Sequence, residues 1–199
     1  MGRLILIRHG ESEANREKFF ATEDTPLTEL GFQQASEAAA HIAARFEPAA
    51  VISSTLLRAR QTADIVAAEL ALPVEVVPGL EECDFGIFKG RSYRNFRELI
   101  AGDPTYDPKR PWTWCPEGGE SNEETQRRVV PVLDRLRERH PDDDIVVVCH
   151  GMVMVAVWAH FSGTWEGADV PPNCALVVVE HDAAQCLPPV LVITSENWA

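Results

Sequence analysis

The sequence is short of positive charge, and this shortage argues against several kinds of partner. Its 199 residues include 18 lysines and arginines against 31 aspartates and glutamates, which gives a formal net charge of −13. Nucleic-acid binding depends on basic surfaces that neutralise phosphates, and anionic membranes attract basic segments. We therefore expect no nucleic-acid partner and no membrane partner. A small phosphorylated substrate stays compatible, because the charge inside a cleft can oppose the charge of the whole chain.

Long apolar runs and paired cysteines are also missing. No segment approaches the ~18 uninterrupted apolar residues of a membrane span, and the amino-terminal run becomes polar too soon for a signal peptide. The five cysteines include no C-x-x-C pair, which argues against a zinc site or a redox motif. Free thiols are typical of a reducing compartment. We therefore expect a cytoplasmic protein without a zinc or redox cofactor.

Short apolar runs alternate with helical patterns along the chain. The runs predict strands at residues 4–7, 51–52, 74–77, 145–148, 176–179 and 190–193. Apolar residues at helical spacing predict helices at residues 28–46, 55–70, 122–139 and 152–161. Thr28 is the expected N-cap of the first helix, and Pro131 should kink the third or start a new one. The alternation predicts an α/β fold, a three-layer α/β/α sandwich with a mainly parallel central sheet.

One domain is expected over residues 1–199, because no repeat, low-complexity tract or linker interrupts the chain. Residues 78–119 nevertheless break the regular pattern, with one helix expected at about residues 93–100. Long irregular insertions in compact domains often serve as lids or binding loops. We expect a lid or specificity insertion at about residues 83–118, where aromatic and basic side chains would select the substrate. The sequence leaves both a monomer and a homo-oligomer open.

Functional groups follow two of the predicted strands. The segment Arg8-His9-Gly10-Glu11-Ser12 follows the first strand, and His150-Gly151 follows the strand at 145–148. Ligands of parallel sheets bind at the carboxyl ends of the strands, and an arginine there can donate two hydrogen bonds to a phosphate. Gly10 should permit a tight turn and the close approach of a ligand.

Two further clusters are predicted to lie near this edge. Residues 53–62 place Arg58 at a strand-to-helix junction, where backbone N–H groups favour an anion. The carboxylates Glu81, Glu82 and Asp84 follow the third strand. Each feature alone has an ordinary interpretation as a structural histidine, a solvated helix face or an acidic loop. Their coincidence at several strand ends favours an anion-binding catalytic site.

These segments resemble the signature of the histidine phosphatase superfamily, which includes the cofactor-dependent phosphoglycerate mutases and many phosphomonoesterases. The resemblance extends along most of the chain, and its ordered segments are residues 8–12, 26–31, 53–62, 80–86, 118–121 with 128–129, and 150–151. It implies a phosphoglycerate mutase-like fold. It also implies a metal-independent phosphomonoester hydrolase that acts on a small phosphorylated metabolite.

The resemblance implies a role for each catalytic residue. His9 would be the nucleophile that forms a phosphohistidine. Arg8, Arg58 and His150 would hold the phosphoryl oxygens and spread their charge. Glu82 would protonate the leaving oxygen and then take a proton from the attacking water.

Other residues of these motifs receive less specific roles. Asn15 would add a hydrogen bond to the phosphoryl group, and Ser12 and Gly151 are placed with it among the substrate-binding residues. Glu81 and Asp84 compete with Glu82 as the acid, but the family spacing of an acid, three residues and a glycine selects Glu82. The remaining polar residues are assigned structural positions: Ser54 and Thr62 as turn or cap residues, and Cys149 as a buried small side chain.

Three other functions are less compatible with the sequence than the phosphatase. A cofactor-dependent phosphoglycerate mutase needs a second set of cations and a long closing segment, and the insertion here is modest. A non-catalytic phospho-ligand binding module would lack the nucleophile or the acid, yet both are present. A metal hydrolase built from His9, His150, Glu82 and Asp84 would need a spacing such as H-E-x-x-H or H-x-H, which the sequence does not contain.

Overall fold

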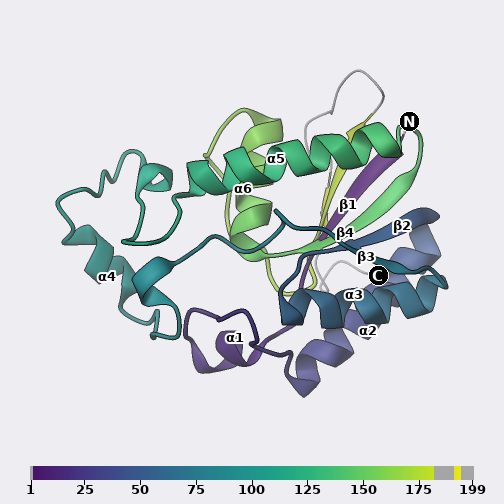
Figure 1. The fold of residues 1–199 in the computed structure, drawn as a ribbon, viewed down its shortest axis with the longest axis horizontal. Coiled ribbons are helices and arrows are strands. Elements are labelled where there is room, and N and C mark those ends of the chain that lie inside the picture. Colours follow the sequence, from purple (N-terminus) through teal and green to yellow (C-terminus); the bar gives the residue numbers. More distant parts are fainter. Residues whose placement is uncertain (1, 182–190, 194–199) are drawn as a thin grey trace.

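The sheet at the centre of the molecule is mixed. The computed structural model describes residues 2–181 and the backbone of 191–193 (Figure 1). Within these residues the sheet has six strands in the order β3-β2-β4-β1-β5-β6. Their bounds in this spatial order are Val74–Val76, Pro48–Ser53, Asp144–Cys149, Gly2–Arg8, Leu176–His181 and Leu191–Ile193. The pairings β1–β4, β2–β4 and β2–β3 are parallel, and β5 runs antiparallel to β1 and β6.

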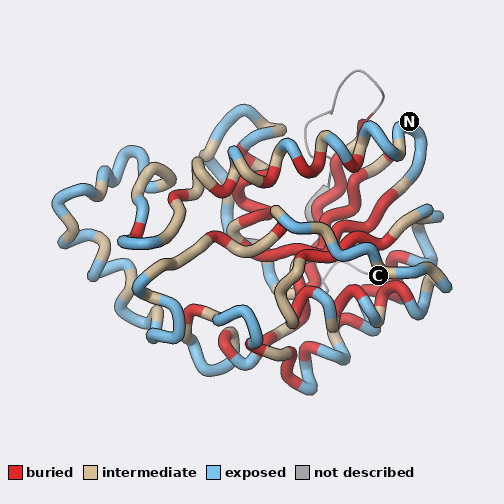
Figure 2. The backbone as a smooth tube through the Cα atoms, viewed as in Figure 1, coloured by how far each residue is buried: buried red, intermediate tan, exposed pale blue. Residues whose placement is uncertain are grey.

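Helices cover both faces of this sheet (Figure 1). One face carries α5 (Asn122–Arg139) and α6 (Gly151–Ser162), and the other carries α2 (Glu29–Arg45) and α3 (Leu57–Leu70). Strand β1 shows why, because alternate side chains of a strand point to opposite faces. Leu4 and Leu6 belong to the core under α5 and α6, whereas Ile5 and Ile7 belong to the core under α2 and α3. The expected three-layer sandwich is therefore confirmed, and Figure 2 shows the central strands β1, β4 and β5 as largely buried.

The main helices start and end close to their predicted positions. The Thr28 hydroxyl accepts a hydrogen bond from the Gly31 N–H at 3.0 Å, which confirms Thr28 as the N-cap of α2. Of the two alternatives predicted for Pro131, a kink or a new helix, the second is wrong, because α5 runs through Pro131 without interruption. A proline removes one backbone donor, and the burial of Val129 and Leu133 on either side of it supports the helix.

The segment 83–118 holds only short elements, as its irregular sequence predicts. These are the 3₁₀ turns η1 (Gly86–Phe88) and η2 (Pro111–Thr113) and the helix α4 (Phe96–Ala101). Aromatic contacts join the segment to the chain before α2, because Phe20 lies 4.3 Å from Phe85 and 4.7 Å from Phe96 between ring centroids. The helix α1 (Glu13–Glu17) was not predicted, because five residues are too few to show helical periodicity.

The register of β1 and β4 brings two functional segments together. Arg8 pairs with Cys149 at the ends of these parallel strands. The residues that follow the ends of these two strands are His9 and His150, which therefore leave the sheet side by side. Among residues 2–181, none of the helices is both long enough and apolar enough to cross a membrane.

Candidate active site

Two histidines and an arginine meet at the carboxyl ends of β1 and β4. The ring centroids of His9 and His150 lie 5.2 Å apart, with their planes inclined by 58°. Arg58, in the first turn of α3, donates from Nε to Nε2 of His9 at 3.2 Å. His9 is 3% exposed and Arg58 is 2% exposed. The three residues predicted to share one sheet edge are therefore close neighbours.

His9 is held as a neutral imidazole with one nitrogen available. Its Nδ1 lies 2.7 Å from the carbonyl oxygen of Gly10, so this nitrogen carries the proton and donates it. Burial lowers the pKa of His9 well below its usual range, and the charges of Arg58 and Arg8 lower it further. The lone pair is then left on Nε2, the atom that faces Arg58. A neutral ring with an unprotonated Nε2 is the form that can act as a nucleophile.

Within the described residues, the hydrogen bonds of the two arginines go to backbone carbonyls and to His9, and not to a carboxylate. Arg58 donates from Nη1 to the carbonyl of Thr22 at 3.0 Å, and Arg8 donates from Nη1 to the carbonyl of Pro171 at 2.6 Å. Burial lowers the pKa of both guanidinium groups, with Glu82 acting in the opposite direction. Arginine still remains charged at neutral pH. Within the described part of the chain, Nε of Arg8 is buried without a hydrogen-bond partner, and an anion would supply one.

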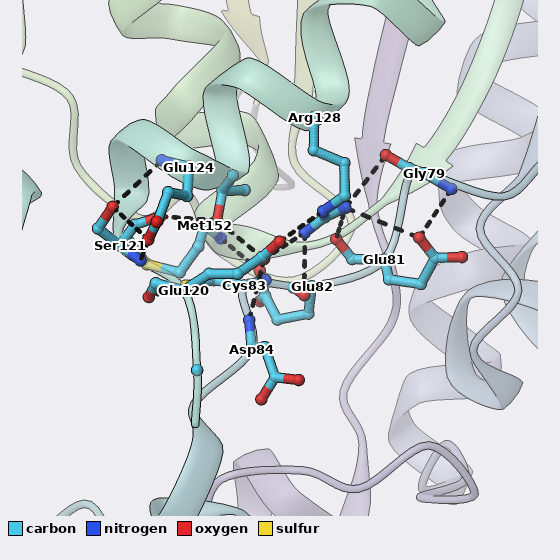
Figure 3. Close-up of polar contacts among 12 residues, drawn as sticks. Gly79, Glu81, Glu82, Cys83, Asp84, Glu120, Ser121, Glu124, Arg128 and Met152 are labelled. Carbon is cyan, nitrogen blue, oxygen red and sulfur yellow. Dashed lines mark hydrogen bonds and ion pairs between the residues drawn. The ribbon is translucent and has the colours of Figure 1, made fainter. Parts of the chain in front are cut away.

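Glu82 differs from the two carboxylates next to it. Its Oε1 accepts from the backbone N–H groups of Met152 and Cys83, both at 3.0 Å, so the carboxyl lies at the N-terminus of α6 (Figure 3). Burial raises the pKa of Glu82, although Arg58 and Arg8 oppose the shift. A carboxyl that keeps its proton more readily is suited to act as a general acid.

The neighbouring carboxylates are engaged elsewhere. Glu81 accepts from the Thr55 hydroxyl at 2.7 Å and from the Gly79 N–H at 2.8 Å. Burial alone would raise the pKa of Asp84, but hydrogen bonds from Lys89 and from the Gly86 N–H outweigh it and lower the pKa. The geometry therefore favours Glu82 among the three candidates.

Asn15 is oriented by a residue that sequence reasoning missed. Its Oδ1 accepts from the Ser12 N–H at 3.1 Å, from the Ser12 hydroxyl at 2.9 Å and from Nδ2 of Asn173 at 3.1 Å. Nδ2 of Asn173 also donates to the His9 carbonyl at 3.0 Å. The amide of Asn15 therefore points its Nδ2 away from these donors, where it is available to a ligand. A lone asparagine outside any strand-end motif gives no signal in a sequence.

Ser12 is mainly a structural residue here. Its hydroxyl caps α1 and forms a capping box with Asn15, so its donor and acceptor are both in use. Ser54 and Thr62, which were predicted to be turn or cap residues, also make long-range contacts. The Ser54 hydroxyl lies 2.8 Å from Nε2 of His150, and the Thr62 hydroxyl accepts from the Gly10 N–H at 3.1 Å. Both residues connect the histidine segments to the start of α3.

Gly10 also has a packing role that was not predicted. A Cβ atom on Gly10 would lie 2.3 Å from the carbonyl oxygen of Gly31, so the backbone of α2 approaches this glycine closely. Gly151 does border the ligand space. A Cβ atom there would lie 2.8 Å from the Val170 side chain and 3.5 Å from Nε of Arg8.

A cavity of about 710 Å³ opens in front of these groups. The predicted site residues on its wall are Arg8, His9, Ser12, Asn15, Arg58, Glu82 and Gly151. His150 is fully buried beside His9 and is not among the residues that line the cavity. The other residues that line the cavity include Phe20, Phe85, Lys89, Tyr93 and Arg97. The space is large enough for a small metabolite.

Cys149 is fully buried, as expected, and burial raises the pKa of its thiol far above neutrality. A thiol with a raised pKa is a poor nucleophile. Among the residues that the structure describes, no group of three or more His, Cys, Asp or Glu side chains is arranged to hold a metal ion.

Bacterial relatives resemble this chain in sequence. An adenosylcobalamin/alpha-ribazole phosphatase of Escherichia coli is 31% identical over 206 residues, which cover 92% of this chain and 97% of that protein. A bifunctional protein of Mycobacterium tuberculosis is 37% identical over 153 residues, which cover 74% of this chain. The matched part spans 41% of the length of that longer relative.

A solved structure and a family model also match this chain. A mycobacterial glucosyl-3-phosphoglycerate phosphatase in complex with inorganic phosphate has a TM-score of 0.80 at 27% identity, with 98% of each chain covered. The family model of the histidine phosphatase superfamily (branch 1) matches residues 4–191. A match over this length shows that the chain belongs to branch 1 of the histidine phosphatase superfamily.

Proposed function

We propose that the protein hydrolyses phosphate monoesters of small metabolites through a phosphohistidine on His9. One observation carries this proposal. A neutral His9 presents its Nε2 next to the buried guanidinium of Arg58, at 3.2 Å, on the wall of a cavity. A nucleophile beside a fixed cation is the arrangement that transfer of a phosphoryl anion requires.

In the first step, Nε2 of His9 attacks phosphorus and the bond to the ester oxygen breaks. Glu82 gives its proton to this leaving oxygen and becomes a carboxylate. Arg8, Arg58 and the Nδ2 of Asn15 hold the other phosphoryl oxygens. His150, whose ring lies 5.2 Å from that of His9, would contact the phosphoryl group through its Nδ1, which is unpaired within the described residues. Cations that are already in place need no rearrangement as the charge moves.

In the second step, water attacks the phosphohistidine in line with the bond to Nε2. The Glu82 carboxylate takes one proton from this water, so the attacking oxygen becomes part of the product. The bond between phosphorus and nitrogen breaks, and inorganic phosphate leaves. His9 returns to its neutral form and Glu82 to its protonated form, so the cycle is closed.

The cavity residues from the segment 83–118 indicate the substrate class. We assign residues 83–118 as a specificity lid of a single domain, because Phe85, Lys89, Tyr93 and Arg97 face the space in front of His9. These side chains suit a leaving group that has both apolar and anionic or hydroxylated parts. The relatives named for alpha-ribazole and glucosyl-3-phosphoglycerate support a phosphorylated small molecule.

A cytoplasmic location is part of the same proposal. The four cysteines that the structure describes are all free thiols, and Cys83, Cys149 and Cys174 are buried. Free cysteines are typical of proteins in reducing compartments.

The test is hydrolysis of 4-nitrophenyl phosphate in the presence of excess chelator. We expect full release of phosphate, because the proposed mechanism uses no metal ion. Loss of activity on chelation would favour a metal hydrolase instead. A second reaction with 3-phosphoglycerate and a bisphosphorylated primer should give little 2-phosphoglycerate. Efficient conversion there would identify a mutase.

A further inference from the structure

We propose that Arg128 is a positioning residue for the general acid. This inference rests on the proposed function, because it concerns how Glu82 is held in place for proton transfer. Arg128 lies in the second turn of α5 and does not border the cavity. It acts through the loop that carries Glu82.

All five N–H donors of Arg128 are used, three on backbone carbonyls of the loop that carries Glu82 and two on the carboxylate of Glu120 (Figure 3). Nη1 donates to the carbonyls of Gly79 and Glu81, both at 3.1 Å, and Nη2 donates to the carbonyl of Glu82 at 3.4 Å. The remaining donors bind the Glu120 carboxylate, with Nε at 2.8 Å and Nη2 at 2.6 Å. A single guanidinium therefore fixes three carbonyls within four consecutive residues.

The loop needs such a partner, because it belongs to no helix or strand. Residues 79–84 lie between β3 and η1, and their backbone forms no ladder of hydrogen bonds with a neighbouring strand. The Leu80 side chain anchors one point of the loop in the core under α5. Leu80 fixes the position of the loop, but hydrogen bonds to its carbonyls are needed to fix the direction in which its side chains project.

Glu120 extends the same clamp to the far end of the loop. Its N–H donates to the Asp84 carbonyl at 2.7 Å, and its carboxylate accepts from the Asp84 N–H at 3.3 Å. The helix that carries Arg128 is itself rigid at this end, because Ser121 and Glu124 form a capping box. Arg128 and Glu120 thus connect a capped helix to the backbone on both sides of Glu82.

The position of Glu82 matters most when the leaving group is a strong base. An alkoxide leaves phosphorus only if it receives a proton, whereas 4-nitrophenolate leaves readily without one. If the loop moved so that Glu82 no longer reached the leaving oxygen, the hydrolysis of alkyl esters would slow more than the hydrolysis of 4-nitrophenyl phosphate. A general loss of folded protein would slow both esters by the same factor.

The experiment compares Arg128→Lys with Arg127→Lys, a matched change at the adjacent exposed position. For each we would measure kcat/KM on 4-nitrophenyl phosphate and on glycerol phosphate, since kcat/KM reports the first phosphoryl transfer. Lysine keeps the charge but cannot replace five donors of fixed geometry. We expect Arg128→Lys to lower kcat/KM by ~10²-fold for glycerol phosphate and by less than ~5-fold for 4-nitrophenyl phosphate. Arg127→Lys should leave both within ~2-fold of the unmodified protein.

Equal losses on the two esters, or no loss on either, would overturn the inference. A double variant with Glu82→Gln sharpens the result, because Arg128→Lys should then cause no further selective loss. If Arg128→Lys does not fold, Glu120→Gln tests the same clamp and should show the same selectivity in a weaker form. Failure of the proposed function looks different, because the unmodified protein would then hydrolyse neither ester, or would do so without His9.

Discussion

Nε of Arg58 donates a hydrogen bond to Nε2 of His9, the ring nitrogen that the proposed mechanism uses for attack. The same contact blocks protonation of that nitrogen in the resting protein. In the proposed mechanism, the Arg58 guanidinium exchanges this hydrogen bond for one to a phosphoryl oxygen of the substrate. The lone pair of Nε2 is then available to attack phosphorus. The two residues come from different segments, 49 positions apart, and the parallel strands β1, β4 and β2 hold them together.

Replacing Arg58 by lysine tests this relationship. A lysine keeps the positive charge but loses the fork that binds both His9 and a phosphoryl oxygen. We expect kcat/KM for 4-nitrophenyl phosphate to fall by ~10²-fold or more, the usual cost of losing one preorganised donor. Arg60→Lys is the control, because Arg60 lies in the same helix and is exposed. Activity of Arg58→Lys within threefold of the control would contradict the assignment.

The pH dependence should follow from two pKa shifts of opposite sign. The lowered pKa of His9 keeps the nucleophile neutral until the pH falls far below 6.5, and activity should be lost only in that acidic range. The raised pKa of Glu82 keeps this acid protonated above the usual carboxyl pKa of about 4.5. Activity on an alkyl ester should therefore decline as the pH rises through the raised pKa of Glu82. The profile of kcat/KM for glycerol phosphate measures both limbs.

Glu82→Gln gives the control for this profile. Glutamine cannot release a proton, so the alkaline limb that belongs to Glu82 should disappear while the acidic limb stays. An unchanged alkaline limb in this variant would assign the ionisation to another group.

Asn173→Asp should weaken phosphate binding without touching the cavity wall. The carboxylate cannot donate to the His9 carbonyl or to Oδ1 of Asn15, so two bonds become repulsive contacts. We expect the inhibition constant of inorganic phosphate to rise by ~10-fold, with thermal unfolding as the check on folding. In an Asn15→Ala background the same change should have a smaller effect, since the amide that it orients is gone. Equal effects in both backgrounds would remove Asn15 as the intermediary.

Much of the fold could be predicted, because its strands have strong local signals. Residues 4–7 are wholly apolar since β1 is buried on both faces, and this pattern alone implies helices on two sides. The antiparallel direction of β5 was not predicted, because an apolar run looks the same in either direction. The predicted strand at residues 190–193 appears as β6 from Leu191, and position 190 lies outside the described residues.

The site was predictable where function follows a strand end and unpredictable elsewhere. His9, His150 and Arg58 each follow a predicted strand closely, so the sheet edge could be inferred from sequence. The purpose of Gly10 and the role of Thr62 depend on which distant backbone approaches them, and no local pattern records that approach. Asn173 and Arg128 act by hydrogen bonds to segments more than 40 positions away, which only the folded chain brings near.

The central claim is a phosphoryl group carried on His9, and trapping it is the most direct measurement. Glu82→Gln should accept phosphate from 4-nitrophenyl phosphate, since that leaving group needs no proton, and should release it slowly because no base activates water. Quenching at alkaline pH preserves an acid-labile phosphohistidine for peptide mass spectrometry. We expect one phosphate on the peptide that contains His9, and none when His9→Ala is added. Phosphate on any other residue, or turnover that survives His9→Ala in the otherwise unmodified protein, would contradict the account.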